Sequence, residues 1–163
     1  MARRKPRFKG VATQPAQRTA ESAWDIQLAD PAEAVYKELL RLANEAEVRS
    51  DPTNNHCTTL RMVDEVLDKI IPHNPIDRPN ALAGNLSNIY RYGKGRIRIF
   101  WIASSQKRKV YVLHISDTPR KEGNAYDPYE VFGRMVLSGR FNALFDDLGV
   151  RLSDMARSSY ASH

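Results

Sequence analysis

The sequence predicts an α+β fold, in which two N-terminal helices pack on a three- to four-stranded antiparallel sheet and a further helix follows near the C-terminus. Three observations lead to this fold class. Two stretches with the apolar spacing of helices come first, three stretches with the two-residue alternation of strands follow, and a stretch with helix start signals comes after them. A chain of 163 residues is long enough to bury an ordinary hydrophobic core as a single domain.

The first helix is expected to begin at Asp30. Asp30 is a residue type that caps helices, Pro31 suits the first helical position, and Glu33 stands where a capping box needs an acid. The helix is expected to end near residues 49–52. Its apolar residues recur at helical spacing, which predicts a buried face formed by Val35, Leu39, Leu42 and Ala46.

The second helix is expected over residues 55–71. It is predicted to stop at Pro72, because a proline there removes a backbone hydrogen bond and clashes with the preceding turn. Its buried stripe is expected to be Leu60, Val63, Leu67 and Ile70. A short connection between the two helices predicts an antiparallel helical hairpin.

Three strands are expected over residues 89–92, 96–103 and 109–116, joined by two tight basic turns. The longest strand has one wholly apolar face, Ile97, Ile99 and Trp101, which can pack on the helices; its other face carries Arg96, Arg98, Phe100 and Ile102. Strict alternation in the last strand groups His114 with Val110 and Val112, and groups Ile115 with Tyr111 and Leu113.

A third helix is expected to start at Asp127, which can cap it, with Pro128 at the first position and Glu130 at the third. One or two further helical turns are expected over residues 141–148. This reading divides the chain into a basic, flexible N-terminal arm over residues 1–27, a folded domain over residues 28–148 and a weakly ordered tail over residues 149–163. Trp24 and Ile26 are the residues that can attach the arm to the core.

Composition excludes several classes of protein. No apolar run is long enough to span a bilayer, and the N-terminus lacks the apolar segment of a signal peptide, so a cytoplasmic protein without membrane contact is expected. The single cysteine, Cys57, allows no internal disulfide and no cysteine-cluster zinc site. The four histidines are widely scattered, so neither a metal nor a cofactor is expected.

The positive charge is concentrated. Residues 88–121 hold nine of the 25 Lys and Arg residues and a single acid, Asp117, although the whole chain carries a net charge of only +6. A concentrated basic sheet indicates a polyanionic partner. Whether the basic residues of the N-terminal arm add phosphate contacts or form a solvated tail stays open.

Arginine forks match phosphate oxygens, and tyrosine rings can stack on unpaired bases, so RNA binding is one reading of the sheet. The other reading is an edge strand that charge protects from aggregation. The near-absence of acids favours RNA, because an edge charged for solubility usually mixes signs. The residues concerned are Arg91, Lys94, Arg96, Arg98, Arg120 and Lys121, interleaved with Tyr90, Tyr92, Tyr126 and Tyr129.

Three motifs carry a resemblance to a known family: YGKGRIRIFW, KVYVLHISD and DPYEVFGRMV. Together with the order of the expected elements, they resemble the RelE/ParE superfamily of bacterial type II toxins, and the YhaV family most. The resemblance covers about residues 32–148. Pro128 stands where that family usually has alanine.

The resemblance implies a RelE-like toxin, a metal-independent endoribonuclease that cleaves messenger RNA, either on the ribosome or free. In such a reaction the ribose 2′-hydroxyl attacks the adjacent phosphorus and leaves a 2′,3′-cyclic phosphate. The protein then needs only to orient the RNA, accept a proton and place cations where charge develops. The resemblance also implies a cognate antitoxin as partner, of the AbrB-like swapped-hairpin type.

Site residues follow from the resemblance by position. Arg98 and Arg120 are expected to clamp the scissile phosphate, while Tyr129, with Tyr126 as a competitor, stacks on a base or assists proton transfer. The remaining basic residues, Arg91, Lys94, Arg96 and Lys121, are expected to bind the RNA backbone. The general base stays open: His114 is the one residue poised by type, although a lone histidine is more often structural. Arg98 has a second reading, in which it braces the fold through Asp127 or Glu130.

Two alternatives remain beside the nuclease. One is a non-catalytic module of the same fold, either a gyrase inhibitor or an RNA-binding protein. The other is a basic accessory protein that binds nucleic acid through the first ten residues, with a purely structural sheet.

Overall fold

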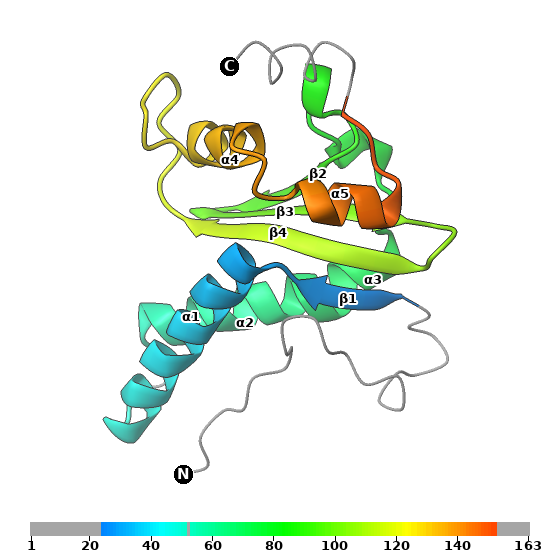
Figure 1. Cartoon of the computed structure of the whole chain (residues 1–163). Helices are drawn as coiled ribbons and strands as arrows, with labels where there is room; N and C mark the ends of the chain where they lie inside the picture. The colour runs from blue at the N-terminus through cyan, green and yellow to red at the C-terminus, as the bar shows by residue number, and fades with distance from the viewer. Residues whose placement is uncertain (1–23, 52, 153–163) are drawn as a thin grey trace.

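The computed structural model describes residues 24–51 and 53–152. A central sheet has helices on both faces, as Figure 1 shows. Helices α1 (Asp30–Val48) and α2 (Asn55–Glu65) cover one face, here called the α1 face, and helices α4 (Pro128–Leu137) and α5 (Asn142–Leu148) cover the other, called the α4 face. The α+β class and the C-terminal helix are therefore confirmed.

The sheet has four strands in the order β1-β4-β3-β2. Strands β2 (Tyr90–Lys94), β3 (Ile97–Ser104) and β4 (Lys109–Asp117) pair antiparallel and lie close to the expected bounds. The fourth strand, β1 (Asp25–Leu28), pairs parallel with β4, so the sheet is mixed rather than wholly antiparallel.

Strand β1 occupies the end of the expected N-terminal arm. Ile26 and Leu28 alternate into the core beneath α1, and Trp24 packs against that core, which agrees with the expected attachment. A strand of four residues is too short to show a recognisable alternation of apolar and polar residues, so the sequence did not predict it. Residues 1–23 of the arm and 153–163 of the tail lie outside the described residues.

A β-bulge in β4 corrects the expected faces of that strand. The register shifts between Phe100 and Trp101: Phe100 pairs with His114, whereas Trp101 pairs with Val112, which leaves Leu113 as the extra residue. Ile115 is therefore in the core of the α1 face, and His114 lies on the α4 face beside Phe100. Strict alternation predicted the reverse for both residues.

Helix α1 starts where expected but differs in its cap and its buried face. Ala29 is the N-cap and provides no side-chain hydrogen bond, so Asp30 is the first helical residue rather than the cap. Val35 and Leu42 are only partly buried. The residues that are buried along the helix are Pro31, Ala32, Tyr36, Leu39, Leu40, Ala43 and Ala46.

The second helix continues past Pro72, contrary to the expected stop. A π-helical turn, Val66–Ile70, follows α2 and leads into the short helix α3 (Ile71–His73). In that turn the Ile71 N–H bonds to the Val66 carbonyl five residues back. The π-helical turn replaces the regular hydrogen bonds between residues four apart, which a proline would interrupt in an α-helix. It also rotates Ile71 rather than Ile70 into the core. Two 3₁₀ turns, Arg78–Asn80 and Gly84–Leu86, complete the route to β2.

The α4 face has a core of its own. Phe100 stacks on Phe132 of α4 with ring centroids 4.1 Å apart, and Phe132 also contacts Phe141, which precedes α5. Asp127 caps α4 by accepting a hydrogen bond from the Tyr129 N–H, as the sequence predicted. Among the described residues, no helix is long and apolar enough to cross a membrane.

Candidate nucleic-acid interface

Two arginines lie against the ring of Tyr129 at the start of α4. The Arg120 Cζ atom is 4.3 Å from the centre of its ring, and the Arg91 Cζ atom is 6.0 Å from it. Phe100 meets the same ring edge-on, with centroids 5.5 Å apart. Cation–π attraction and packing thus hold two positive charges beside one tyrosine ring. Arg91, Arg120 and Tyr129 are here called the arginine–tyrosine cluster.

Asp127 holds Arg120 and the start of α4 in place. Its carboxylate pairs with the Arg120 guanidinium and accepts the main-chain N–H groups of Lys121 (2.7 Å) and Tyr129 (3.1 Å). Burial opposes the charge on Asp127, but these bonds outweigh it and hold the pKa of its carboxyl below the usual value. The Asp127 side chain is 1% exposed and that of Arg120 is 41% exposed, so part of the guanidinium remains open to a ligand.

Arg98 lies over the β2–β3 hairpin. Its Nη1 atom donates to the carbonyls of Gly95 and Ile97, at 2.8 Å each, and its side chain covers Gly93, the residue that pairs with it across the strands. A Cβ atom at Gly93 would lie 3.0 Å from the Arg98 Cδ and Nε atoms. The bracing partners of Arg98 are thus main-chain carbonyls, whereas Asp127 pairs with Arg120.

Strand pairing places the site residues in two lines across the α4 face. Arg91, Phe100 and His114 form one line, and Gly93, Arg98 and Ser116 form the next. Arg91 and Arg98 therefore project on the side of α4, where Arg91 lies against the Tyr129 ring. His114 lies beyond Phe100 from Arg91, about 10 Å away across two strand spacings.

His114 is packed rather than poised against the cluster. Its ring is nearly parallel to those of Phe100 and Phe132, with both centroids 6.4 Å away, and its Nδ1 atom is buried without a hydrogen-bond partner. Burial, with a smaller contribution from the charge of Arg140, lowers the pKa of His114 to about 4. The imidazole is therefore neutral at neutral pH.

Other expected site residues lie outside the cluster. Lys94 pairs with Ile97, so its side chain projects from the α1 face of the sheet, as do those of Tyr90 and Tyr92. Arg96 is in the hairpin turn, where its guanidinium bonds to the Asp117 carbonyl (3.1 Å) and lies 3.5 Å from its carboxylate. Lys121 and Tyr126 are exposed in the loop before α4.

Sequence reasoning missed one interaction in the site and one charge close to His114. Asp127 was recognised as a helix cap, but its pairing with Arg120 depends on the path of the loop, which the sequence does not reveal. Arg140 was not singled out, because it follows α4 in an unremarkable turn and becomes relevant only where the chain returns near His114.

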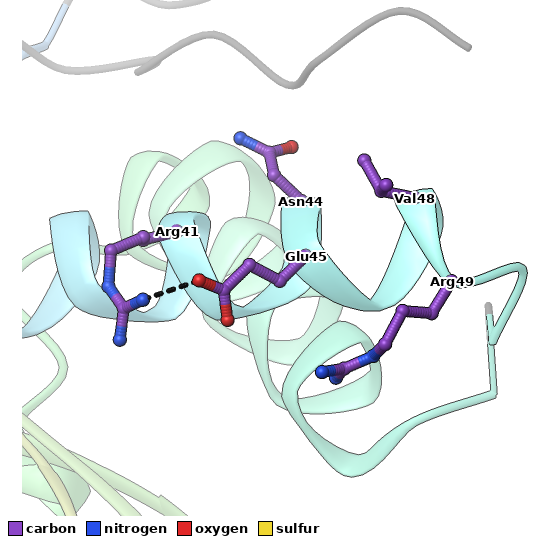
Figure 2. A pocket seen from close by; sticks show the side chains of 5 residues that line it. All are labelled: Arg41, Asn44, Glu45, Val48 and Arg49. Carbon is purple, nitrogen blue, oxygen red and sulfur yellow. Dashed lines mark hydrogen bonds and ion pairs between the residues drawn. The ribbon is translucent and has the colours of Figure 1, made fainter.

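A hollow of about 410 Å³ lies elsewhere, along the exposed side of α1 (Figure 2). Arg41 in its lining is paired with Glu38 and Glu45. It is on the helix layer opposite α4 and contains no residue of the arginine–tyrosine cluster. Within residues 24–51 and 53–152, no group of three or more His, Cys, Asp or Glu side chains could hold a metal ion.

An α+β domain with arginines and a tyrosine gathered on one sheet face is the arrangement expected of a protein that acts on nucleic acid. The comparison with protein families narrows this class. The model of the YhaV toxin family, described as a toxin with endonuclease activity of a toxin–antitoxin system, matches residues 25–152. The chain belongs to this family.

Membership confirms the expected toxin, its endonuclease activity and its place in a toxin–antitoxin system. The protein is therefore an enzyme. The matched segment begins at the first residue of β1 and ends at Leu152, which is buried in the core of the α4 face.

Solved structures show more distant similarity. The isolated RelE toxin of E. coli is 15% identical, covering 69% of this chain and 95% of its own, with a TM-score of 0.44. A chain of the RelBE2 toxin–antitoxin complex of Mycobacterium tuberculosis is 13% identical, covering 57% of this chain and 95% of its own, with a TM-score of 0.42. A chain of the intact RelBE toxin–antitoxin complex of E. coli is 14% identical, covering 60% of this chain and 99% of its own, with a TM-score of 0.43. No curated protein matches the chain.

Proposed function

We propose that this toxin cleaves RNA at the arginine–tyrosine cluster, through attack of a ribose 2′-hydroxyl on the adjacent phosphorus. The P–O5′ bond then breaks, leaving a 2′,3′-cyclic phosphate on one product and a 5′-hydroxyl on the other. The observation that carries the proposal is that the guanidinium groups of Arg91 and Arg120 both lie against the Tyr129 ring, with the buried carboxylate of Asp127 paired to Arg120.

The chemistry suits this arrangement because the nucleophile belongs to the substrate. The protein has to orient the phosphodiester and stabilise the negative charge that grows on its oxygens, and fixed arginines do both. Arg120 meets the phosphate with the exposed part of its guanidinium, and Arg98 and Arg91 bind the flanking backbone from the sheet. No metal is required for these steps.

Proton transfer is assigned to Tyr129. Arginine stays protonated in proteins, so within the cluster only the tyrosine hydroxyl can exchange a proton with the substrate. His114 is given a packing role, because it lies beyond Phe100 and its neutral ring completes an aromatic stack. This choice fills the role of general base, which the sequence left open with His114 as the one residue poised by type.

The substrate class we propose is messenger RNA in the cytoplasm, either free or on the ribosome. The proposed partner is a cognate antitoxin that covers the same basic face; the AbrB-like swapped-hairpin type is our expectation for it. An acidic or amphipathic segment of the antitoxin would complement the charge of Arg91, Arg98 and Arg120 directly.

The test uses purified toxin on a single-stranded RNA, with and without ribosomes, followed by mapping of both product ends. The cut should be abolished by one 2′-deoxy substitution at the mapped position, and unmodified RNA should yield the cyclic phosphate. Equal cleavage of the 2′-deoxy substrate, or products with a 5′-phosphate, would show a different reaction. Growth arrest of expressing cells with intact RNA would instead favour a gyrase-type toxin.

A further inference from the structure

Tyr126 is the most exposed large hydrophobic residue among those that the structure describes, at 77%. The other tyrosines near the site are in contact with protein: Tyr129 touches Phe100 and two arginines, and Tyr90 is buried against Trp101. The Tyr126 ring is therefore free to contact a ligand, and the basic residues beside it favour a nucleotide.

The backbone that carries Tyr126 is held on both sides. The Tyr126 N–H donates to the Asn124 side-chain oxygen (2.8 Å), and the Asp127 N–H donates to the Asn124 carbonyl (3.1 Å). From α4, the Arg134 guanidinium donates to the Ala125 carbonyl (2.7 Å). The ring is therefore presented from an ordered turn, so little backbone freedom is lost when a ligand covers it.

The surroundings of Tyr126 are cationic and adjoin the proposed scissile phosphate. Tyr126 precedes Asp127, which pairs with Arg120, and consecutive Cα atoms are about 3.8 Å apart. Lys121 is exposed at the start of the same loop, and Arg134 is exposed in the last turn of α4. A nucleotide whose phosphate meets Arg120 thus has its base within reach of the Tyr126 ring.

We infer that Tyr126 is a stacking platform for one unpaired nucleobase next to the scissile phosphate, an inference that rests on the cleavage proposed above. Stacking tolerates every base, because each has a π face, but it requires that the base be free of its Watson–Crick partner and neighbours. Tyr126 would then select single-stranded RNA at the cut. Loss of one such contact weakens binding by about tenfold or more.

The test measures binding without cleavage. The probe is a 2′-O-methyl oligonucleotide, uncleavable by 2′-hydroxyl attack, that carries the fluorescent adenine analogue 2-aminopurine at one position in turn. With the full-length protein, the emission should fall at one position where the base stacks. Tyr126→Ala should lose that signal and bind about tenfold more weakly, whereas Tyr126→Phe and the control Leu137→Ala should match the wild type. The same strand in a duplex should give no Tyr126-dependent signal.

The outcomes separate this inference from the proposed cleavage. Equal affinity and equal quenching in Tyr126→Ala would overturn the stacking role and leave cleavage of unmodified RNA unaffected. A Tyr126-dependent signal together with intact unmodified RNA would uphold the base site and overturn the proposed reaction. No binding by the wild-type protein would overturn both.

Discussion

Asp127 is the residue on which the position of Arg120 depends. Its carboxylate joins the loop, the first turn of α4 and the Arg120 guanidinium through three separate donors. The sequence showed the cap, because an Asp before Pro-Tyr-Glu is a strong local signal. It could not show the ion pair, because the residues between Arg120 and Asp127 follow no regular pattern.

Asp127→Asn should therefore lower RNA cleavage by roughly 10- to 100-fold, because a misdirected arginine loses most of its effect on the transition state. The asparagine oxygen can still accept the Tyr129 N–H that caps α4, although the Lys121 N–H then loses its acceptor, so the fold should persist with reduced stability. Single-turnover cleavage rates measure the loss, with the exposed Asp146→Asn on α5 as the matched control.

A double-mutant cycle distinguishes positioning from a general structural effect. In an Arg120→Ala background, Asp127→Asn should cause no further loss, because both substitutions remove the same interaction. Full additivity of the two losses would mean that Asp127 does not act through Arg120.

His114 makes stability depend on pH. In the unfolded chain its pKa is near 6.5, and in the folded protein it is about 4. Between these values the unfolded chain binds the proton and the folded protein does not, so the free energy of unfolding falls as pH falls through this window. From pH 7.5 to pH 5 the His114 contribution to this loss should be roughly 2 kcal/mol.

Urea unfolding at both pH values checks this prediction. His114→Gln removes the titrating group and should flatten the decrease in unfolding free energy. An unchanged decrease in the variant would show that other groups control the acid sensitivity.

At the scale of elements, the β2–β3 hairpin sets the direction of Arg98. The sequence predicted both strands and the turn, because alternation and two closely spaced glycines are local signals. It did not reveal that Arg98 covers Gly93, since that contact depends on register across the strands.

Gly93→Ala should displace the Arg98 side chain, because the new Cβ would lie 3.0 Å from its Cδ and Nε atoms. We expect cleavage to fall severalfold while the melting temperature changes little, since a flexible side chain can move aside. Gly133→Ala in α4 is the matched control, because a Cβ there meets nothing within 4 Å. Equal activity of the two variants would remove Arg98 from the site.

The elements that the sequence mispredicted share a cause. The bulge at Leu113 and the π turn at Val66–Ile70 each insert one residue into a regular repeat, and both reverse or rotate every side chain that follows. The periodic spacing of apolar residues predicts a helix or strand, but it does not show where one extra residue interrupts the repeat. The assignment of His114 to the wrong face followed from this limit.

For the whole molecule, the sheet separates two cores, and the candidate site lies on the edge of one of them. The α1 face holds one of these cores, within which the Trp101 indole N–H donates to the Pro75 carbonyl. The α4 face combines an aromatic core with the basic residues that come from β2, β3, the loop and α4. Fold class and most basic residues were predictable from the sequence, whereas β1 was not, because its partner strand lies about eighty residues away.

The most direct measurement of the central claim compares Arg120→Ala with Arg61→Ala in single-turnover cleavage of one RNA by the folded protein. Arg61 is an exposed arginine on α2, in the opposite helix layer, and is the matched control. Removal of a transition-state donor should slow Arg120→Ala by about 100-fold or more, while Arg61→Ala keeps the wild-type rate. A folded Arg120→Ala protein that cleaves as fast as Arg61→Ala would contradict the arginine–tyrosine cluster as the site of cleavage.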